Sequence, residues 1–247
     1  MRRVAVLICL MLASLLAPVA GHAEGACYKA TFEADRFTVC RYDPAHDTLR
    51  LAARGPAGPL DSLQGLKASL GQDGRRVRFA LNGGMYQPDQ SPVGLYVADG
   101  QTQTALNRAA GSGNFFLKPN GVFWVGADGA PHVDETEAFA SAAPAAAWAT
   151  QSGPLLVSRG ALHPAVAANG TSLTVRDAVG VKGRQALFVI SDGPVSFGRL
   201  ARFLRDGLGC ADVLYLDGHV ASLWAPNLRR LDGRTGLGTF VVVLRRR

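Results

Sequence analysis

The chain has 247 residues, 48% of them hydrophobic, with 26 Lys and Arg against 19 Asp and Glu. This length and composition are enough for one domain with a sizeable core. The basic residues are scattered and no nucleic-acid-binding motif is present, so we expect no nucleic-acid partner; the positive field would instead favour an anionic substrate.

The N-terminus has the pattern of a cleavable secretory signal. Arg2 and Arg3 precede an uncharged apolar run over 4–20, and Gly21 and Ala23 then provide small residues at the two positions that a signal peptidase inspects. A transmembrane anchor is the alternative, but the run is short for a bilayer and polar sequence follows it directly. We predict a signal peptide over 1–23, a mature domain over 24–247 and no membrane span after cleavage. The abundance of Ala, Gly and Arg suggests a bacterial source, and hence a periplasmic or secreted protein.

Three cysteines remain once Cys9 leaves with the signal. Cys27 and Cys40 flank a short segment of strand-like residues, and in an oxidising compartment they are expected to staple a hairpin. Cys210 precedes a very apolar strand, so we expect a buried, inert thiol rather than a nucleophile. The histidines lack metal-ligand spacing and no phosphate-cradling loop is present, so the sequence predicts neither a metal nor a cofactor. A divalent ion bound through backbone and Asp oxygens is the alternative, since it would leave no spacing signature.

Hydrophobic periodicity and turn residues predict the secondary structure in chain order. A short helix is expected over 61–70, an Ala-rich helix over 134–148 interrupted at Pro144, and a third helix over 196–208 with Ser196 as its N-cap and Gly209 at its end. Strands are expected over 77–81, 93–97, 121–125, 155–157, 187–190, 212–216 and 239–244. The pattern predicts a single α+β domain with a central, largely mixed β-sheet flanked by helices.

Two strand ends carry polar residues followed by glycine. Asn82 is followed by Gly83 and Gly84, and Asp217 by Gly218 and His219. Glycine lets a ligand approach the backbone closely, which makes both ends candidate sites. Asn-Gly and Asp-Gly are also the commonest hairpin turns, so a purely structural role is the alternative.

Three further polar groups stand beside predicted buried strands. Gln151 and Ser152 lead into one strand, Arg176 precedes another, and Asp192 follows a third at the start of the best helix. Arg176 could form a structural ion pair with Asp177 or another acid. Asp192 could be a catalytic carboxylate or simply an acid at a helix N-terminus.

Four segments in this order resemble the phosphodiester glycosidase family, in a bacterial, periplasmic branch. They are Asn-Gly-Gly with an aromatic neighbour at 82–86, Gln-Ser-Gly-Pro-Leu-Leu at 151–156, Arg-x-Ala-Val-Gly at 176–180 and Leu-Asp-Gly at 216–218. The resemblance implies an exported hydrolase that cleaves the glycosidic bond of a sugar-1-phosphate diester and releases sugar and a phosphomonoester. The expected partner is thus a phosphate-carrying substrate, either a small molecule or a glycan of the cell envelope or the extracellular space.

The resemblance also assigns roles. Arg176 would bind the phosphodiester with its planar fork, and Asp217 would activate water or stabilise an oxocarbenium-like sugar. Asn82, the third expected catalytic residue, would hold sugar hydroxyls or phosphate oxygens together with the Gly83 and Gly84 amides. The expected substrate-binding residues are Gly83, Gly84, Gln151, Ser152, Asp192, Gly218 and His219.

His219 departs from the family pattern, which often has a second glycine after Leu-Asp-Gly. The histidine either narrows the site, joins the chemistry or is a surface residue. This departure motivates a second hypothesis, a non-catalytic exported carbohydrate-binding or exopolysaccharide-related protein on the same fold.

Overall fold

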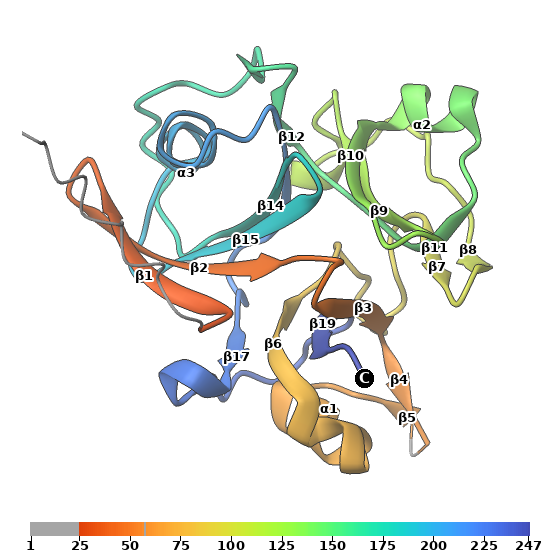
Figure 1. Cartoon of the computed structure of the whole chain (residues 1–247). Helices are drawn as coiled ribbons and strands as arrows, with labels where there is room; N and C mark the ends of the chain where they lie inside the picture. The colour runs from red at the N-terminus through yellow and green to blue at the C-terminus, as the bar shows by residue number, and fades with distance from the viewer. Residues whose placement is uncertain (1–24, 57) are drawn as a thin grey trace, which may run out of the picture.

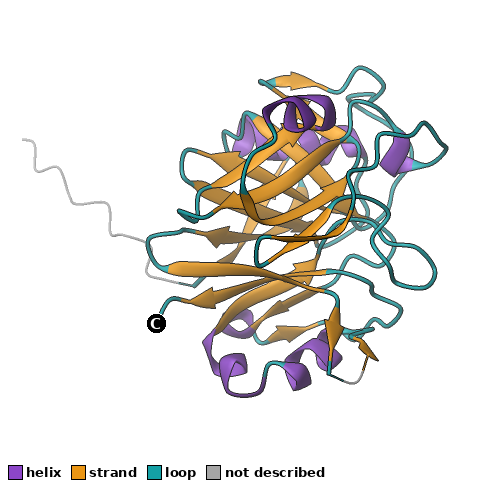
Figure 2. Cartoon of the chain, turned by 90° about the vertical axis from the view of Figure 1, so that its right-hand side faces the viewer, coloured by secondary structure: helices purple, strands orange, loops and turns teal. Residues whose placement is uncertain are grey.

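The computed structural model describes residues 25–56 and 58–247. The predicted signal peptide, 1–23, lies outside these residues. Strands make up most of the regular structure and three short α-helices lie at its periphery, which confirms a single α+β domain (Figure 1). Figure 2 shows the strands stacked through the middle of the molecule, with helical segments at its outer edges. Within the described residues no helix is long and apolar enough to cross a membrane.

The strands form three main sheets. The seven-stranded sheet has the order β1 (Cys27–Phe32), β2 (Asp35–Tyr42), β15 (Gln185–Ser191), β14 (Asp177–Lys182), β16 (Asp212–Asp217), β12 (Leu155–Ser158), β13 (Ala161–Leu162). One five-stranded sheet has the order β10 (Pro131–Glu135), β9 (Gly121–Gly126), β11 (Ala146–Ser152), β7 (Tyr96–Ala98), β8 (Gln101–Thr104). The other has the order β18 (Arg230–Leu231), β17 (Leu223–Ala225), β6 (Val77–Asn82), β19 (Phe240–Arg245), β3 (Asp47–Ala52). A small ribbon pairs β4 (Arg54–Gly55) with β5 (Gly58–Pro59).

The expected mixed sheet is not what forms. Every strand pairing in the described residues is antiparallel. A strand–helix–strand step such as the one from β15 to β16 is typical of parallel neighbours. The two strands do run in the same direction, but β14 lies between them and is antiparallel to both. The helix therefore crosses over an inserted strand, which periodicity along the chain does not reveal.

Two of the three expected helices form close to their predicted bounds. Helix α1 spans Leu63–Ser69, and its N-cap is Ser62, whose hydroxyl accepts the Gly65 N–H. Helix α3 spans Phe197–Arg202 with Ser196 as N-cap, as predicted, and continues as a π-helical turn over Phe203–Gly207. The shorter 3₁₀ segments cover Gly71–Arg76, Asn114–Phe116 and Pro226–Leu228.

The helix expected over 134–148 forms before Pro144, as predicted, but the part expected after Pro144 is wrong. Helix α2 covers only Thr136–Ala142, and Ala143 leaves the helix in the left-handed conformation with φ of 43°. The following segment is instead β11, paired with β9 from Ala146 to Ser152. Tertiary pairing thus overrides the helix propensity of the alanines. The strand expected over 93–97 begins late, at Tyr96.

The core lies where the three sheets meet. Phe188 on β15 contacts Phe79 on β6 and Phe123 on β9, with ring centroids 5.6 and 5.4 Å apart. On the outer face of the seven-stranded sheet, Phe203 stacks on Phe37 at 4.2 Å. Burial on both faces gives this sheet a rigid frame for residues at its strand ends.

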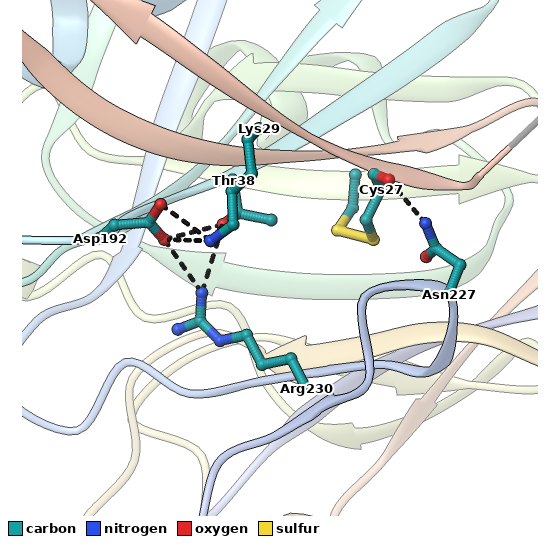
Figure 3. Close-up of a disulfide and its surroundings, with 7 residues drawn as sticks. Cys27, Lys29, Thr38, Asp192, Asn227 and Arg230 are labelled. Carbon is teal, nitrogen blue, oxygen red and sulfur yellow. Dashed lines mark hydrogen bonds and ion pairs between the residues drawn. A yellow bond between two sulfur atoms is a disulfide. The ribbon is translucent and has the colours of Figure 1, made fainter.

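The cysteines behave as predicted. Cys27 and Cys40 are cross-strand partners on β1 and β2 and form a disulfide (Figure 3). The Asn227 side chain donates to the Cys27 carbonyl at 2.7 Å, which ties this hairpin to the segment after β17. Cys210 is free and buried, and burial raises the pKa of its thiol to about 12.

Candidate active site

Antiparallel pairing of β14 with β16 brings Arg176 and Asp217 together. Arg176 precedes the first residue of β14, Asp217 is the last of β16, and Asp177 is the cross-strand partner of Asp217. Both candidate residues line a cavity of about 420 Å³, called here the Asp217 cavity. Its other walls come from Met85, Tyr86, Val93, Asn114, Ser172, Leu173, Thr174, Tyr215, Gly218, His219 and Val220.

Arg176 is buried without a carboxylate partner in the described part of the chain. Its Nε donates to the Val195 carbonyl at 2.9 Å, and its Nη2 donates to the Ser172 carbonyl at 3.1 Å. The guanidinium also lies 3.8 Å from the Phe197 ring centroid, a cation–π distance. The suggested ion pair with Asp177 does not form. Neutral partners hold the guanidinium in place, so its charge is left to attract an anion.

Asp217 is partly exposed at the cavity wall. Its Oδ1 accepts the Gly218 N–H at 2.6 Å and its Oδ2 accepts an Asn82 Nδ2 hydrogen at 3.2 Å. Burial raises the pKa of the Asp217 carboxyl to about 6, although both hydrogen bonds and the nearby His219 act in the opposite direction. A carboxyl with such a pKa can accept or give up a proton near neutral pH.

Asn82 supports Asp217 from behind. It is fully buried at the end of β6, and its Oδ1 accepts the Ser222 N–H at 2.7 Å. The side chain thus joins the sheet that contains β6 to both Asp217 and the loop after it. Asn82 lies outside the residues that line the cavity, so its place is that of a positioning residue.

Gly83 and Gly84 lie outside the cavity lining as well. The Gly83 N–H donates to the Thr239 carbonyl at 2.9 Å, and the Gly84 N–H donates to the Thr150 hydroxyl at 3.1 Å. A Cβ on Gly84 would collide with that hydroxyl and with the Gln151 carbonyl. These glycines allow close packing between sheets, and their amides are already bonded within the protein.

Gln151 and Ser152 are also buried away from the cavity. Gln151 Oε1 accepts the N–H groups of Leu95 and Asn107 at 3.0 and 2.9 Å. Ser152 Oγ donates to the Leu216 carbonyl at 3.0 Å, next to Asp217. The two side chains therefore support the framework of the site.

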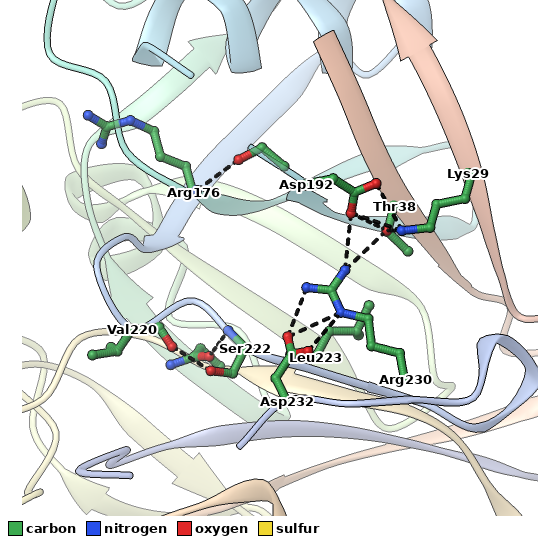
Figure 4. Close-up of polar contacts among 11 residues, drawn as sticks. Lys29, Thr38, Arg176, Asp192, Val220, Ser222, Leu223, Arg230 and Asp232 are labelled. Atoms are coloured by element: carbon green, nitrogen blue, oxygen red, sulfur yellow. Dashed lines mark hydrogen bonds and ion pairs between the residues drawn. The ribbon is translucent and has the colours of Figure 1, made fainter. Parts of the chain in front are cut away.

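Asp192 belongs to a different part of the molecule. It accepts hydrogen bonds from Lys29 at 2.9 Å, Thr38 at 2.8 Å and Arg230 at 3.1 Å, and Arg230 also binds Asp232 at 2.8 Å. We call Lys29, Thr38, Asp192, Arg230 and Asp232 the Asp192 cluster. Figure 4 shows this cluster and the Arg176 guanidinium extending away from it. The structure thus does not bring Asp192 to the Asp217 cavity.

Gly218 and His219 are both at the cavity, with different exposure. Gly218 is buried, and a Cβ there would collide with the Tyr215 hydroxyl. His219 is exposed and lines the cavity. A histidine can therefore follow Leu-Asp-Gly here because its side chain lies on the surface.

Asp177 is a site residue that sequence reasoning missed. It is completely buried, and its Oδ1 accepts the Asp217 N–H at 2.6 Å. Burial and the neighbouring charge of Asp217 raise the pKa of Asp177 well above that of an ordinary aspartate. Its place beside Arg176 was the available signal, but the register that sets it opposite Asp217 appears only in the fold. In the described residues no group of three or more His, Cys, Asp or Glu could share a metal ion.

Comparison with known proteins places this geometry in a family. Residues 75–235 match the family model of phosphodiester glycosidase. The uncharacterized protein YigE of Escherichia coli (strain K12) is 36% identical over 164 residues, which cover 66% of this chain and 63% of that protein. The chain thus matches slightly less than two thirds of that relative's length.

Solved structures share the fold at low sequence identity. The zebrafish N-acetylglucosamine-1-phosphodiester alpha-N-acetylglucosaminidase catalytic domain, auto-inhibited by its pro-peptide, superposes with a TM-score of 0.58 at 14% identity, over 90% of this chain and 82% of that one. A hypothetical protein from Synechocystis gives a TM-score of 0.53 at 16% identity, over 89% and 61%. The family match spans well over half of the sequence and contains both Arg176 and Asp217. This chain belongs to the phosphodiester glycosidase family.

Proposed function

We propose that this protein is an exported hydrolase that cleaves the glycosidic carbon–oxygen bond of a sugar-1-phosphate diester. The observation that carries the proposal is one cavity lined by a buried arginine without a carboxylate partner among the described residues and by a carboxyl with a pKa of about 6. In this reaction the arginine binds the anionic phosphate, and the carboxyl acts at the sugar carbon bonded to it, so the two groups must line the same cavity. The family match supports the same reaction type.

Arg176 is the phosphate-binding residue of the proposed reaction. Its hydrogen bonds to Val195, Ser172 and Tyr215 and its contact with Phe197 fix the guanidinium before substrate arrives. Because the cation is already fixed in place, little reorganisation energy is needed to stabilise the charge that develops on the departing phosphate. Arginine stays protonated at any relevant pH, so this contribution does not titrate.

Asp217 is the base of the proposed reaction, and it accepts a proton from the water that attacks the sugar carbon. The C1–O bond to phosphate breaks, the electron pair leaves with the phosphomonoester, and a water oxygen bonds to the same carbon. The water proton passes to the ionised Asp217 and then to solvent. Because phosphate is already a good leaving group, one carboxylate at the reacting carbon suffices where ordinary glycosidases use two.

Export is part of the proposal. The N-terminal pattern over 1–23 and the Cys27–Cys40 disulfide both support an oxidising compartment, the periplasm or the exterior of a bacterial cell. Envelope or extracellular glycans that carry phosphate are the substrates available there.

The test is turnover of p-nitrophenyl sugar-1-phosphate diesters by the chain from Glu24 onward. Carbon–oxygen cleavage releases p-nitrophenyl phosphate, which becomes coloured only after a phosphatase is added. Phosphorus–oxygen cleavage on the aryl side releases p-nitrophenol directly. Phosphorus–oxygen cleavage on the sugar side gives the same products as carbon–oxygen cleavage, but it places the oxygen of water in the phosphate. Turnover in ¹⁸O-water should place the label in the sugar. Direct colour, or label in phosphate, would contradict the proposed bond. Glycan binding without turnover across several sugars would favour the non-catalytic hypothesis, to which the altered residue His219 points.

A further inference from the structure

Asp177 is a buried carboxyl to which the reaction above gives no role. It is 0% exposed, and its Oδ2 has no hydrogen-bond partner in the described residues. Its Oδ1 accepts the backbone N–H of Asp217, the residue that faces the cavity. An ionised carboxylate with one unpaired oxygen is costly to bury, so this side chain is an unusual choice for a merely structural position.

The strand register places Asp177 directly opposite Asp217. Asp177 and Asp217 are cross-strand partners, and the β14–β16 register shifts between Asp177 and Ala178, so the pair lies at a local irregularity of the ladder. Two neighbouring carboxyls, one of them fully buried, do not both ionise near neutral pH, because the charge on the buried carboxyl meets both desolvation and repulsion. The Asp217 carboxyl accepts two hydrogen bonds and is partly exposed to solvent. The Asp177 carboxyl accepts only one hydrogen bond and is not exposed. The proton therefore stays on Asp177.

We propose that Asp177 is a positioning residue that holds the single proton of an Asp177–Asp217 carboxyl pair, so that Asp217 alone is ionised and aimed into the cavity. The inference rests on the proposed function and goes beyond it by assigning the proton. During turnover Asp177 keeps its proton and its bond to the Asp217 N–H. Asp217 receives the proton of the attacking water and returns it to solvent.

The other groups that face the pair do not compete for this proton. Tyr86 and Tyr215 feel both carboxyls, and burial raises the pKa of each phenol above its ordinary value, so both stay neutral. The Arg176 guanidinium donates to the Tyr215 hydroxyl at 3.3 Å. His219 acts on Asp217 from the exposed loop and lowers its pKa. A His219→Gln variant separates its effect from that of Asp177.

The first test is the pH dependence of kcat/KM in Asp177→Asn and Asp177→Ala. Asparagine keeps an acceptor for the Asp217 N–H and stays neutral, so Asp177→Asn should remain within about threefold of the parent near neutral pH. In the parent, kcat/KM should decrease at alkaline pH once Asp177 ionises, and this decrease should be absent from Asp177→Asn. Asp177→Ala lacks the acceptor and should lose at least about tenfold in kcat with a smaller change in KM. An unchanged alkaline decline in Asp177→Asn would overturn the proposal.

The second test needs no turnover. A folded-state pKa above the unfolded value means that the parent loses stability as pH rises past about 4, and both variants lack this loss. The Tm of each variant minus that of the parent should therefore increase by at least about 3 °C between pH 4 and pH 8. The test uses the change of this Tm difference with pH. A loss of Tm caused by imperfect packing is the same at every pH and therefore does not affect the result.

The two tests separate the two proposals. If no diester is hydrolysed but the Tm difference rises with pH, the proposed function fails and the proton assignment stands. If diesters are hydrolysed but the difference is flat, Asp177 does not hold the proton. Asp192→Asn is the matched control, since that carboxyl is already ionised and paired and its removal should give no such rise.

Discussion

The Asp217 cavity and the Asp192 cluster use the same residue types in opposite ways. Both place an aspartate and an arginine at the ends of buried strands. In the Asp192 cluster, Arg230 lies between Asp192 and Asp232 at 3.1 and 2.8 Å, and Lys29 adds a second cation at 2.9 Å. At the Asp217 cavity, Arg176 bonds to carbonyl and hydroxyl groups, and Asp217 bonds to an amide side chain and a backbone N–H.

This difference decides which region can do chemistry. Charges that neutralise each other across 3 Å have little left for a ligand, and such pairs contribute modestly to stability. Charges held by neutral dipoles keep their field and can act on a substrate. The pKa values agree: burial raises that of Asp217, whereas at Asp192 burial is outweighed by the Lys29, Thr38 and Arg230 interactions, which lower it.

The largest expected effect is at Asp217, the carboxyl that lines the cavity. Asp217→Asn should lower kcat/KM by about a thousandfold, because the base at the reacting carbon is removed. Its folded-state pKa is raised, so the carboxyl's contribution to stability is complete below about 4 and is lost as pH rises through about 6. The variant should therefore gain Tm relative to the parent between pH 4 and 7. Turnover close to the parent's would remove Asp217 from the mechanism.

The disulfide tests whether the Asp192 side of the molecule is separate from catalysis. Cys27 and Cys40 are 13 residues apart, and closing a loop of this size stabilises a fold by about 3 kcal/mol. The double variant Cys27→Ser/Cys40→Ser should lose about that much in urea unfolding and keep its kcat. Reduction of the parent with a thiol is the matched control. A large drop in kcat at full folding would show that the two regions are coupled.

A pair of conservative substitutions sharpens the contrast between the two arginines. Arg176→Lys keeps the charge and loses the fixed planar fork, so kcat/KM should fall about 30-fold, equivalent to about 2 kcal/mol. Arg230→Lys, the control, should stay within about threefold of the parent. Steady-state kinetics at pH 7 on one diester decide the matter. Equal losses of kcat/KM in both variants would contradict the assignment of substrate binding to Arg176 and of a structural role to Arg230.

The smallest effect is expected at Asp192. Asp192→Asn should leave kcat/KM unchanged and reduce stability at pH 7 by about 1 kcal/mol, the size of a partly exposed ion pair. Because the folded-state pKa is lowered, this stability is present above about 4 and is lost as pH falls through the folded value. Urea unfolding at pH 7 and pH 3 should show a smaller difference at pH 3. A catalytic defect would restore Asp192 as a site residue.

Local sequence predicted much of the fold. Ser196 and Gly209 delimit the best helix as expected, and the strands around 77–82, 121–126 and 212–217 form where apolar runs end at polar or glycine residues. The Cys27–Cys40 pairing was also predictable, because the two residues flank a short hairpin. The Ala-rich segment before Gln151 misled the prediction because helix propensity is weaker than a full ladder with β9.

Residue identity alone pointed to the groups with suitable chemistry: the acid of Leu-Asp-Gly, the arginine before β14 and the amide of Asn-Gly-Gly. Tertiary structure decided their roles. Register set Asp177 opposite Asp217, neutral partners left Arg176 without a counter-charge in the described chain, and Gly83, Gly84, Gln151 and Ser152 became internal packing and hydrogen bonds. Asp192 was taken by cations from β1 and β18. Charge is a property of a residue, but whether it is neutralised depends on neighbours that are distant in the chain.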